Sequence, residues 1–270
     1  MRTSIFLQLI TILMLVLSIK CVQGNVRLPV LISDGMVLQR DSRINIWGWA
    51  SPGEKVTVKF NNKIFRTKTD SQGNWKIVVP PMKAGGPFSM VVKGNNSIII
   101  ENIMIGDVWF CSGQSNMVTP MERVKERYQE EIKTANYPEI RNFFIPTSSD
   151  VTKVHDDLPP GKWISASPRD IPGFGAVSYF FAKSIYVEYK VPIGIINASV
   201  GGTPIEAWIS EEGLKEIPQY AGRVERFRDT AFMNPIIRMA TRKKTETSQN
   251  PPMGQKFLDG EKLEVALAFS

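Results

Sequence analysis

The periodicity of apolar residues changes near Ile103, and this change constrains the fold more than any other feature of the chain. Before Ile103, short runs of β-branched and aromatic residues are separated by turn sequences such as Pro52-Gly53 and Ser71-Gln72-Gly73. Short strands punctuated in this way are typical of an all-β sandwich. We therefore predict a β-sandwich domain over residues 25–103.

After Ile103, apolar strand segments alternate with segments of helical periodicity. We expect strands over residues 103–111, 140–145 and 191–200. The spacing of apolar residues also predicts a helix over 121–135 and a second, core-facing helix over 177–189. Alternation of strands and helices indicates a parallel sheet with helices on both faces.

These patterns divide the rest of the chain into two parts. Residues 104–235 are assigned to a partial α/β domain, because strand and helix signals persist through them. Residues 236–270 lose the pattern, and we expect an irregular basic tail there. The predicted fold class is therefore α/β, preceded by the N-terminal sandwich.

The first 24 residues have the composition of a secretory signal peptide. Arg2 precedes an apolar run over residues 5–19, and small residues lead to Gly24. A run of roughly 15 apolar residues is short for a membrane span of about 20, although an anchor and lipid attachment at Cys21 stay open as alternatives. We expect a secreted or periplasmic protein with no membrane contact after signal removal. Removal of the signal peptide would also remove Cys21, so Cys111 would be the one cysteine left. Its place at a strand end indicates a buried thiol.

Charge and histidine content exclude several classes of site. The chain has 33 Lys and Arg against 26 Asp and Glu, and we expect this mild excess to be scattered, apart from residues 238–244. It shows no basic stripe of the kind that binds nucleic acid, so we predict no nucleic-acid partner. One histidine, one cysteine in the mature chain and no spaced cluster of ligands indicate no metal site.

A Gly-X-Ser turn follows the first α/β strand, at Gly113-Gln114-Ser115. A serine there projects from the carboxyl edge of the sheet, and Gly201-Gly202 after the third strand should reach the same edge. Ser115 is the candidate nucleophile. Its own N–H and that of Gly201 or Gly202 are candidate oxyanion donors. Taken alone, each motif is more often an ordinary turn.

Together these segments resemble a known family, the sialate O-acetylesterases. The similarity lies in five segments, Gly106–Met117, Asn197–Trp208, Leu31–Arg40, Ile46–Gly48 and Pro192–Gly194. The resemblance implies a flavodoxin-like, three-layer SGNH-hydrolase core. It also implies hydrolysis of acetyl esters on carbohydrates, with O-acetylated sialic acid as the candidate substrate. The implied chemistry passes through an acyl-Ser115 intermediate and uses no cofactor.

Two later blocks of the family have no counterpart in this sequence, namely those carrying the oxyanion Asn and the Asp-X-X-His base. The resemblance therefore implies an incomplete core and impaired activity, with the general base unknown. His155 is not favoured as that base, because it lies in a polar loop-like stretch and its acidic neighbours, Asp156 and Asp157, are adjacent in sequence. The alternative is a non-catalytic carbohydrate-binding or relic product built on the N-terminal sandwich. Trp47, Trp49 and Trp75 could stack on sugar rings there, although alternating aromatic residues in a sandwich are usually core. Nucleotide binding at the Gly201-Gly202 turn is a more distant alternative, since no full phosphate-loop pattern follows it.

Overall fold

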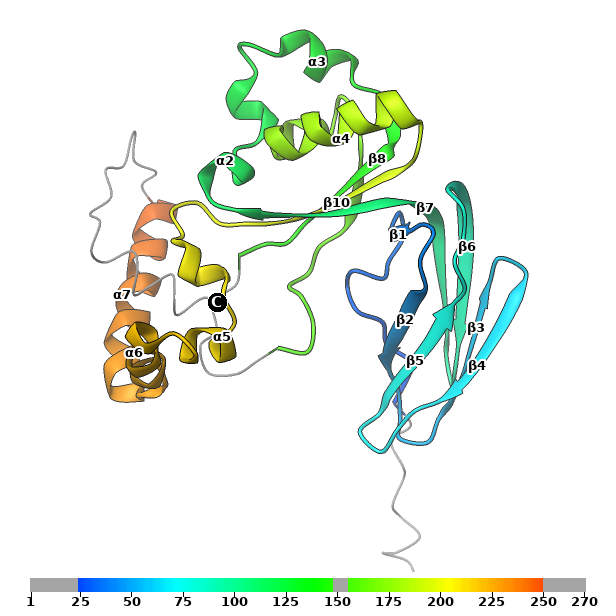
Figure 1. Ribbon diagram of the computed structural model, residues 1–270, viewed down its shortest axis with the longest axis horizontal. Helices are drawn as coiled ribbons and strands as arrows, with labels where there is room; N and C mark the ends of the chain where they lie inside the picture. The colour runs from blue at the N-terminus through cyan, green and yellow to red at the C-terminus, as the bar shows by residue number, and fades with distance from the viewer. Residues whose placement is uncertain (1–23, 148–154, 250–270) are drawn as a thin grey trace, which may run out of the picture. The chain divides into compact units, whose positions relative to one another are not determined.

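The computed structural model describes residues 24–147 and 155–249, and it shows a mixed α/β protein with a large sheet (Figure 1). The chain forms two compact units. The first contains residues up to Leu28 together with Asn45–Val78 and Met90–Ile99, and the second contains the rest. The proposed signal peptide, apart from Gly24, lies outside the described residues.

The first unit is all-β, as the sequence predicts. Strands β3 (Lys55–Phe60) and β4 (Lys63–Lys68) form a hairpin. Its two-residue loop, Asn61-Asn62, has φ of 46° and 57°, the left-handed values that a type I′ turn requires and that asparagine tolerates. Strand β6 (Gly85–Lys93) pairs with the other side of β3, while β2 (Ile44–Trp49) and β5 (Asn74–Val79) form a separate two-stranded sheet.

Alternating side chains in these strands supply the core of the first unit. In β3, the side chains of Val56, Val58 and Phe60 are buried, whereas those of Lys55 and Lys59 are exposed. This period of two places one row of β3 residues inside and the other in solvent. Other buried residues of this unit are Ile46, Trp75, Ile77, Met90 and Val92.

Strand β7 (Ser97–Gly113) is a single 17-residue strand that begins before Ile103, where the sequence predicted that a new strand starts. It passes from the first unit into the second at Ile100, so the structural division differs from a single boundary at residue 103. Two earlier segments, Pro29–Ile44 and Val79–Ser89, also group with the second unit. The first of them does so because β1 (Val37–Gln39) pairs in parallel with β7 at Met104–Gly106.

The second unit contains the predicted parallel sheet. Strand β10 (Ile193–Ser199) lies between β7 and β8 (Tyr137–Phe144) and is parallel to both. Strand β9 (Trp163–Ala166) adds an antiparallel edge to β8. The parallel strands β7, β8 and β10 therefore confirm the three strands expected from the sequence in this unit.

Helix α4 (Ala176–Tyr189) packs on this sheet through the buried side chains of Tyr179 and Ala182. Figure 1 shows α2, α3 and α4 on the same face of the sheet. The helix faces the core, as predicted, and of the apolar residues that indicated it Phe180 and Ile185 pack against the core cluster. The other three were placed wrongly, since Val177, Phe181 and Tyr189 are 50%, 40% and 61% exposed. Tyr179 and Ala182 occupy the fully buried positions of the helix, so its core-facing side is rotated away from Val177 and Tyr189.

The helix predicted over 121–135 is divided in two. A 3-10 turn, η1 (Met121–Val124), is followed by α3 (Gln129–Thr134), with Tyr128 between them at non-helical dihedral angles. The Met121 N–H donates to the carbonyl of Phe174 and the Met121 side chain is fully buried. This tertiary contact fixes the start of the segment.

The last described residues are helical, in η3 (Ile205–Trp208), α5 (Glu211–Lys215), α6 (Pro218–Arg228) and α7 (Thr230–Gln249). Leu214 and Val224 form a small core of their own. Helix α7 continues beyond residue 236, where we expected an irregular tail, because Arg, Lys, Met and Ala favour the helix. Residues 250–270 lie outside the described part. Among the described helices, none is long and apolar enough to cross a membrane.

Candidate active site

Ser115 lies at the end of β7, at the first position of the short helix α2 (Ser115–Val118). Gly113 makes the turn possible: its φ is +138°, and an added Cβ would lie 3.0 Å from Cγ of Met117. The Ser115 carbonyl accepts hydrogen bonds from the N–H of Thr119 at 2.9 Å and from its hydroxyl at 2.6 Å. The Ser115 residue itself is exposed. The turn is thus fixed by its backbone while its serine faces solvent.

The register of β7 and β10 brings the glycine turn to the same place. Ser199 lies opposite Gly113, and the Val200 N–H donates to the Gly113 carbonyl at 2.9 Å. A Cβ built on Gly201 would lie 3.9 Å from Cα and 4.0 Å from Cβ of Ser115. The structure therefore brings Ser115 and Gly201 together, as expected from strands that end at one edge.

Gly202 follows on the exposed side of this turn. Its φ of +82° is in the left-handed region, and a Cβ built there would meet nothing within 4 Å. Glycine is therefore required at residue 202 by backbone conformation, whereas at 201 it leaves room beside Ser115. The assignment of either N–H as an oxyanion donor stays a prediction.

Helix α2 has only four residues. A single turn cannot supply the aligned dipole of a long helix, so any stabilisation of negative charge at this point depends on individual N–H groups. The first N–H groups of a helix have no partner within it, and those of Ser115 and Asn116 belong to this set.

A buried polar cluster lies beneath the Ser115 turn. The side chain of Asn197 is 1% exposed, and its Nδ2 donates to the Met117 carbonyl at 3.4 Å. Its Oδ1 accepts a hydrogen bond of 2.5 Å from the hydroxyl of Ser199, which is equally buried. Because α2 is too short to satisfy the Met117 carbonyl itself, a side chain from β10 does so.

Gly175, directly before α4, closes over this cluster. A Cβ added there would lie 2.6 Å from the Met117 carbonyl oxygen and 2.7 Å from Nδ2 of Asn197. Such distances are too short for any side chain, so the close approach requires glycine. The Ala176 N–H donates to the Thr119 carbonyl at 2.8 Å, which joins α4 to the end of the same turn.

The loop after Gly202 is held by its own side chains. The Thr203 hydroxyl donates to the Val200 carbonyl at 2.9 Å, and Nε1 of Trp208 donates to the Thr203 oxygen at 3.0 Å. This chain of hydrogen bonds connects η3 back to the end of β10. The position of the Gly201-Gly202 turn is therefore defined from both sides.

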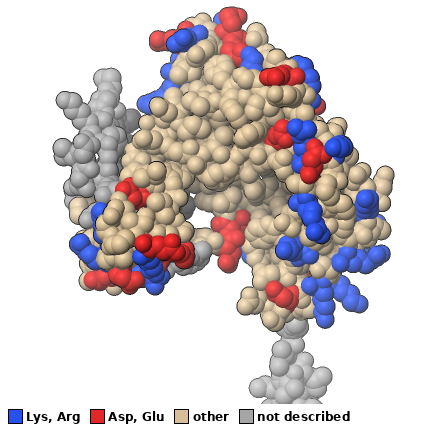
Figure 2. All heavy atoms as spheres, viewed as in Figure 1, with Lys and Arg blue, Asp and Glu red and all other residues tan. Residues whose placement is uncertain are grey.

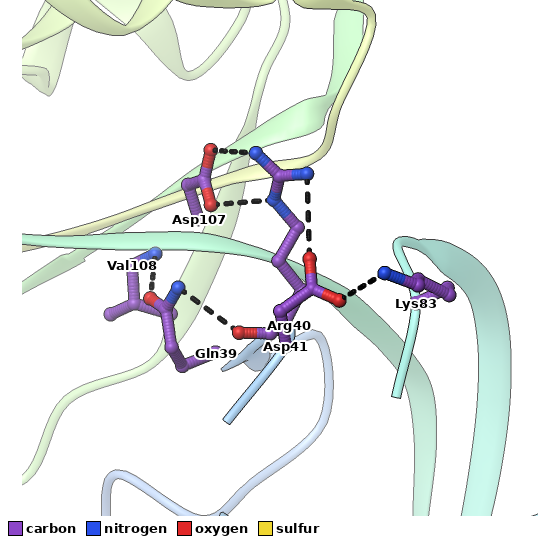
Figure 3. A network of polar contacts seen from close by, with 6 residues as sticks. All are labelled: Gln39, Arg40, Asp41, Lys83, Asp107 and Val108. Atoms are coloured by element: carbon purple, nitrogen blue, oxygen red, sulfur yellow. Dashed lines mark hydrogen bonds and ion pairs between the residues drawn. The ribbon is translucent and has the colours of Figure 1, made fainter. Parts of the chain in front are cut away.

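An ion pair fixes the beginning of the α/β part of β7 (Figure 3). The guanidinium of Arg40 binds both carboxylate oxygens of Asp107, at 2.8 and 3.1 Å, and this hydrogen bonding raises the pKa of Arg40. The Val108 N–H donates to the side chain of Gln39 at 2.9 Å, and Asp41 pairs with Lys83 at 2.7 Å. The sequence resemblance included Arg40 and Asp107, but it assigned no contact between them.

His155 lies on an exposed loop between β8 and β9, just after residues 148–154, which are outside the description. Two residues later, the Asp157 carboxylate accepts the Val30 N–H at 3.1 Å, so that acid serves to hold the loop. The view that His155 is not the base stays a prediction. Within residues 24–147 and 155–249, no group of three His, Cys, Asp or Glu side chains is placed to hold a metal ion.

Cys111 is buried, which confirms the expectation from its place at a strand end. Its side chain belongs to the core cluster that contains Tyr179 and Ile195, and burial raises the pKa of its thiol. The thiol therefore remains protonated near neutral pH and is a poor nucleophile. Ser115 stays the candidate nucleophile of this region.

Comparison with known proteins identifies the family. A family of carbohydrate esterases described as sialic acid-specific acetylesterases matches residues 105–239, half of the chain. The protein belongs to this sialate O-acetylesterase family. Human sialate O-acetylesterase is 33% identical over 207 residues, covering 68% of this chain, and the Pongo abelii enzyme matches equally well. The chain spans 39% of the length of these two relatives.

A solved structure supports the same family. A carbohydrate acetylesterase from Xanthomonas citri shares 38% sequence identity, with a TM-score of 0.66. The match covers 69% of this chain and 43% of that protein. Sequence reasoning had found the Ser115 and glycine turns of the family, but it gave no role to Asn197. The signal for Asn197 was a polar residue directly after the apolar run Ile193–Ile196.

Proposed function

We propose that this protein is a serine-dependent carbohydrate O-acetylesterase whose nucleophile is Ser115. The observation that carries the proposal is the contact between the Ser115 turn and Gly201, where an added Cβ would lie 4.0 Å from Cβ of Ser115. One tetrahedral centre bonded to the Ser115 oxygen can reach N–H groups of both turns over such a distance. Membership of the sialate O-acetylesterase family supports the same chemistry.

The reaction proceeds by two acyl transfers. Oγ of Ser115 forms a bond to the acetyl carbonyl carbon while its proton passes to a base, and the carbonyl oxygen becomes an oxyanion. The N–H groups of Ser115 and of Gly201 or Gly202 stabilise that charge. Collapse breaks the bond to the sugar oxygen, which leaves with the proton, and water then hydrolyses acetyl-Ser115 to acetate. No cofactor or metal ion takes part in these steps.

The general base is not assigned. His155 lies on an exposed loop and remains disfavoured for this role. Replacing His155 with Gln is therefore expected to leave any Ser115-dependent rate unchanged.

We extend the proposal to the fold of each unit, the substrate and the location of the protein. The first unit is proposed to be a β-sandwich, and the second to be part of a flavodoxin-like SGNH-hydrolase core. An acetylated carbohydrate is the proposed substrate, with O-acetylated sialic acid as the first candidate. The N-terminal residues support export to a secreted or periplasmic location.

The non-catalytic alternative has less support. Of the three tryptophans that could bind sugar rings, Trp75 is only 3% exposed and Arg27 lies over the ring of Trp49 at 4.3 Å. The comparisons identify esterases, so a purely binding role is not favoured.

Acetate release from an O-acetylated sialoside and from an aryl acetate tests the proposal. Ser115→Ala should abolish turnover, whereas Ser112→Ala, which changes an exposed serine near the end of β7, should retain it. A fluorophosphonate probe followed by peptide mass analysis should modify Ser115 and leave Ser112 unmodified. Equal rates for the wild-type protein and Ser115→Ala would refute the assignment.

A further inference from the structure

The positive charge of this protein is concentrated in its first unit, although the sequence suggested that it was scattered. In residues 24–28, 45–78 and 90–99 the acidic residues are Glu54 and Asp70 only, against eight cationic ones. The excess of six accounts for most of the formal net charge of +7 of the chain. The eight cations are Arg27, Lys55, Lys59, Lys63, Arg66, Lys68, Lys76 and Lys93.

Strand register places five of these cations on one face of the sheet formed by β4, β3 and β6. Thr57 of β3 lies opposite Arg66 of β4 on one side and Lys93 of β6 on the other. The alternation in β3 puts Lys55 and Lys59 on the same face as Thr57, and Lys68 lies directly opposite Lys55. We call Lys55, Lys59, Arg66, Lys68 and Lys93 the cationic face. Figure 2 shows Lys and Arg side chains gathered over β3 and β4.

No ion pair within the described part of the chain neutralises the cationic face. The two acidic residues of the unit are occupied elsewhere: Glu54 accepts N–H groups of Ser51 and Asn95, and Asp70 accepts those of Gln72 and Asn74. The five cations therefore present their full charge to solvent.

The cost of this arrangement indicates a use beyond solubility. Like charges directly opposite one another, as at Lys55 and Lys68, destabilise an antiparallel pair. Lysines on the edge strand β4 would discourage association with other sheets. That explanation does not extend to Lys59 and Lys93, which lie on the inner strands β3 and β6.

The spacing of the face suits a repeating anion. Alternate residues along a strand are about 7 Å apart and neighbouring strands about 5 Å, so the cations form a flat array. The other outward residues on this face are Thr57, Ile64 and Val91, and none of them is aromatic. Base-stacking platforms of the kind that bind single-stranded nucleic acid are thus missing from the face.

We propose that the cationic face binds an anionic polysaccharide, a glycan chain bearing carboxylates such as sialic acids, outside the Ser115 turn. The choice of a glycan rests on the proposed esterase function, since an acidic glycan would carry the acetyl esters to be cleaved. The binding itself depends on charge complementarity and requires no turnover.

Binding of fluorescently labelled colominic acid, a polymer of sialic acid, tests this surface. The test variant combines Lys59→Gln, Arg66→Gln and Lys93→Gln, which removes one charge from each of the three strands. The matched control combines Lys162→Gln, Arg169→Gln and Lys190→Gln, which changes net charge equally at exposed positions of the second unit. Anisotropy titrations at several salt concentrations give the affinity, and thermal melting shows whether each protein is folded.

The wild-type and control proteins should bind colominic acid and not neutral dextran. The test variant should bind about tenfold or more weakly at low ionic strength, with a shallower salt dependence. Equal affinity of test and control variants would overturn the proposal, as would binding of phosphatidylserine vesicles or a DNA duplex while colominic acid is not bound. If Ser115-dependent turnover is missing but the test variant alone loses binding, the esterase proposal fails and the binding surface stands.

Discussion

The side-chain amide of Asn197 donates a hydrogen bond to the main-chain carbonyl of Met117, two residues after Ser115. This contact joins a buried strand position to the helical turn that carries the serine. The amide oxygen of Asn197 is fixed in turn by the Ser199 hydroxyl at 2.5 Å, so its orientation is defined. The position of Ser115 thus depends on a side chain that itself has no access to substrate.

Replacing Asn197 with Leu should lower kcat for the proposed esterase and leave KM nearly unchanged. The substitution removes the donor to Met117 and leaves the Ser199 hydroxyl without its acceptor, which costs roughly 1–3 kcal/mol of stability. A small displacement of the nucleophile can reduce the rate by on the order of 10- to 100-fold. Steady-state kinetics and amide hydrogen exchange at Thr119, whose N–H binds the Ser115 carbonyl, are the measurements.

Asn142 provides a matched control for this experiment. It is also 1% exposed and lies on β8, next to β10, but among the described residues its side-chain amide has no hydrogen-bond partner. Asn142→Leu should therefore keep or increase stability and leave both kcat and Thr119 exchange unchanged. A similar loss of rate in both variants would show that Asn197 acts only through general stability.

The two adjacent glycines should respond differently to alanine. At Gly201 the new Cβ would make ordinary contacts of 3.9–4.0 Å with Ser115, so the fold should tolerate it. The methyl group would nevertheless occupy space beside the nucleophile, and we expect kcat/KM to fall roughly tenfold or more. At Gly202, where φ is +82°, alanine should cost about 1–2 kcal/mol of stability.

Thermal melting and acetate release on the two variants separate these effects. Gly201→Ala should melt like the wild-type protein but react more slowly, and Gly202→Ala should melt at a lower temperature. A wild-type rate in Gly201→Ala would place the reacting carbonyl elsewhere and weaken the oxyanion assignment.

The sequence predicted the edge at which Ser115 and Gly201 meet because strand ends are encoded locally. An apolar run that stops at a Gly-X-Ser or Gly-Gly turn identifies the end of a strand, and parallel strands place those ends together. The sequence did not predict that Val177 faces solvent while Ala182 packs on the sheet. That choice depends on how closely α4 approaches β10, which is a property of the assembled unit. The Met117–Asn197 contact was hidden for the same reason, since 80 positions separate its partners.

The ion pair between Arg40 and Asp107 should contribute to the stability of the second unit. Its bidentate geometry links the residue after β1 to β7, and such pairs are stronger than single contacts. Arg40→Gln should lower the melting temperature by a few degrees at low salt and by less at high salt. Arg43→Gln, an exposed change of equal charge, should have little effect at either salt concentration. Identical melting of the two variants would mean that the pair adds nothing measurable.

Burial of the Cys111 thiol predicts a loss of stability at alkaline pH. Burial raises its pKa above the ordinary value of 9.0, so the unfolded chain releases this proton more readily than the folded one. The contribution of the buried thiol is therefore complete below pH 9.0 and decreases as the pH rises above it. Denaturant titrations should show that the stability advantage of the wild-type protein over Cys111→Ala shrinks from neutral pH to strongly alkaline pH. Iodoacetamide should modify Cys111 only when the protein unfolds, and rapid modification of the native protein would contradict both the burial and the pH dependence.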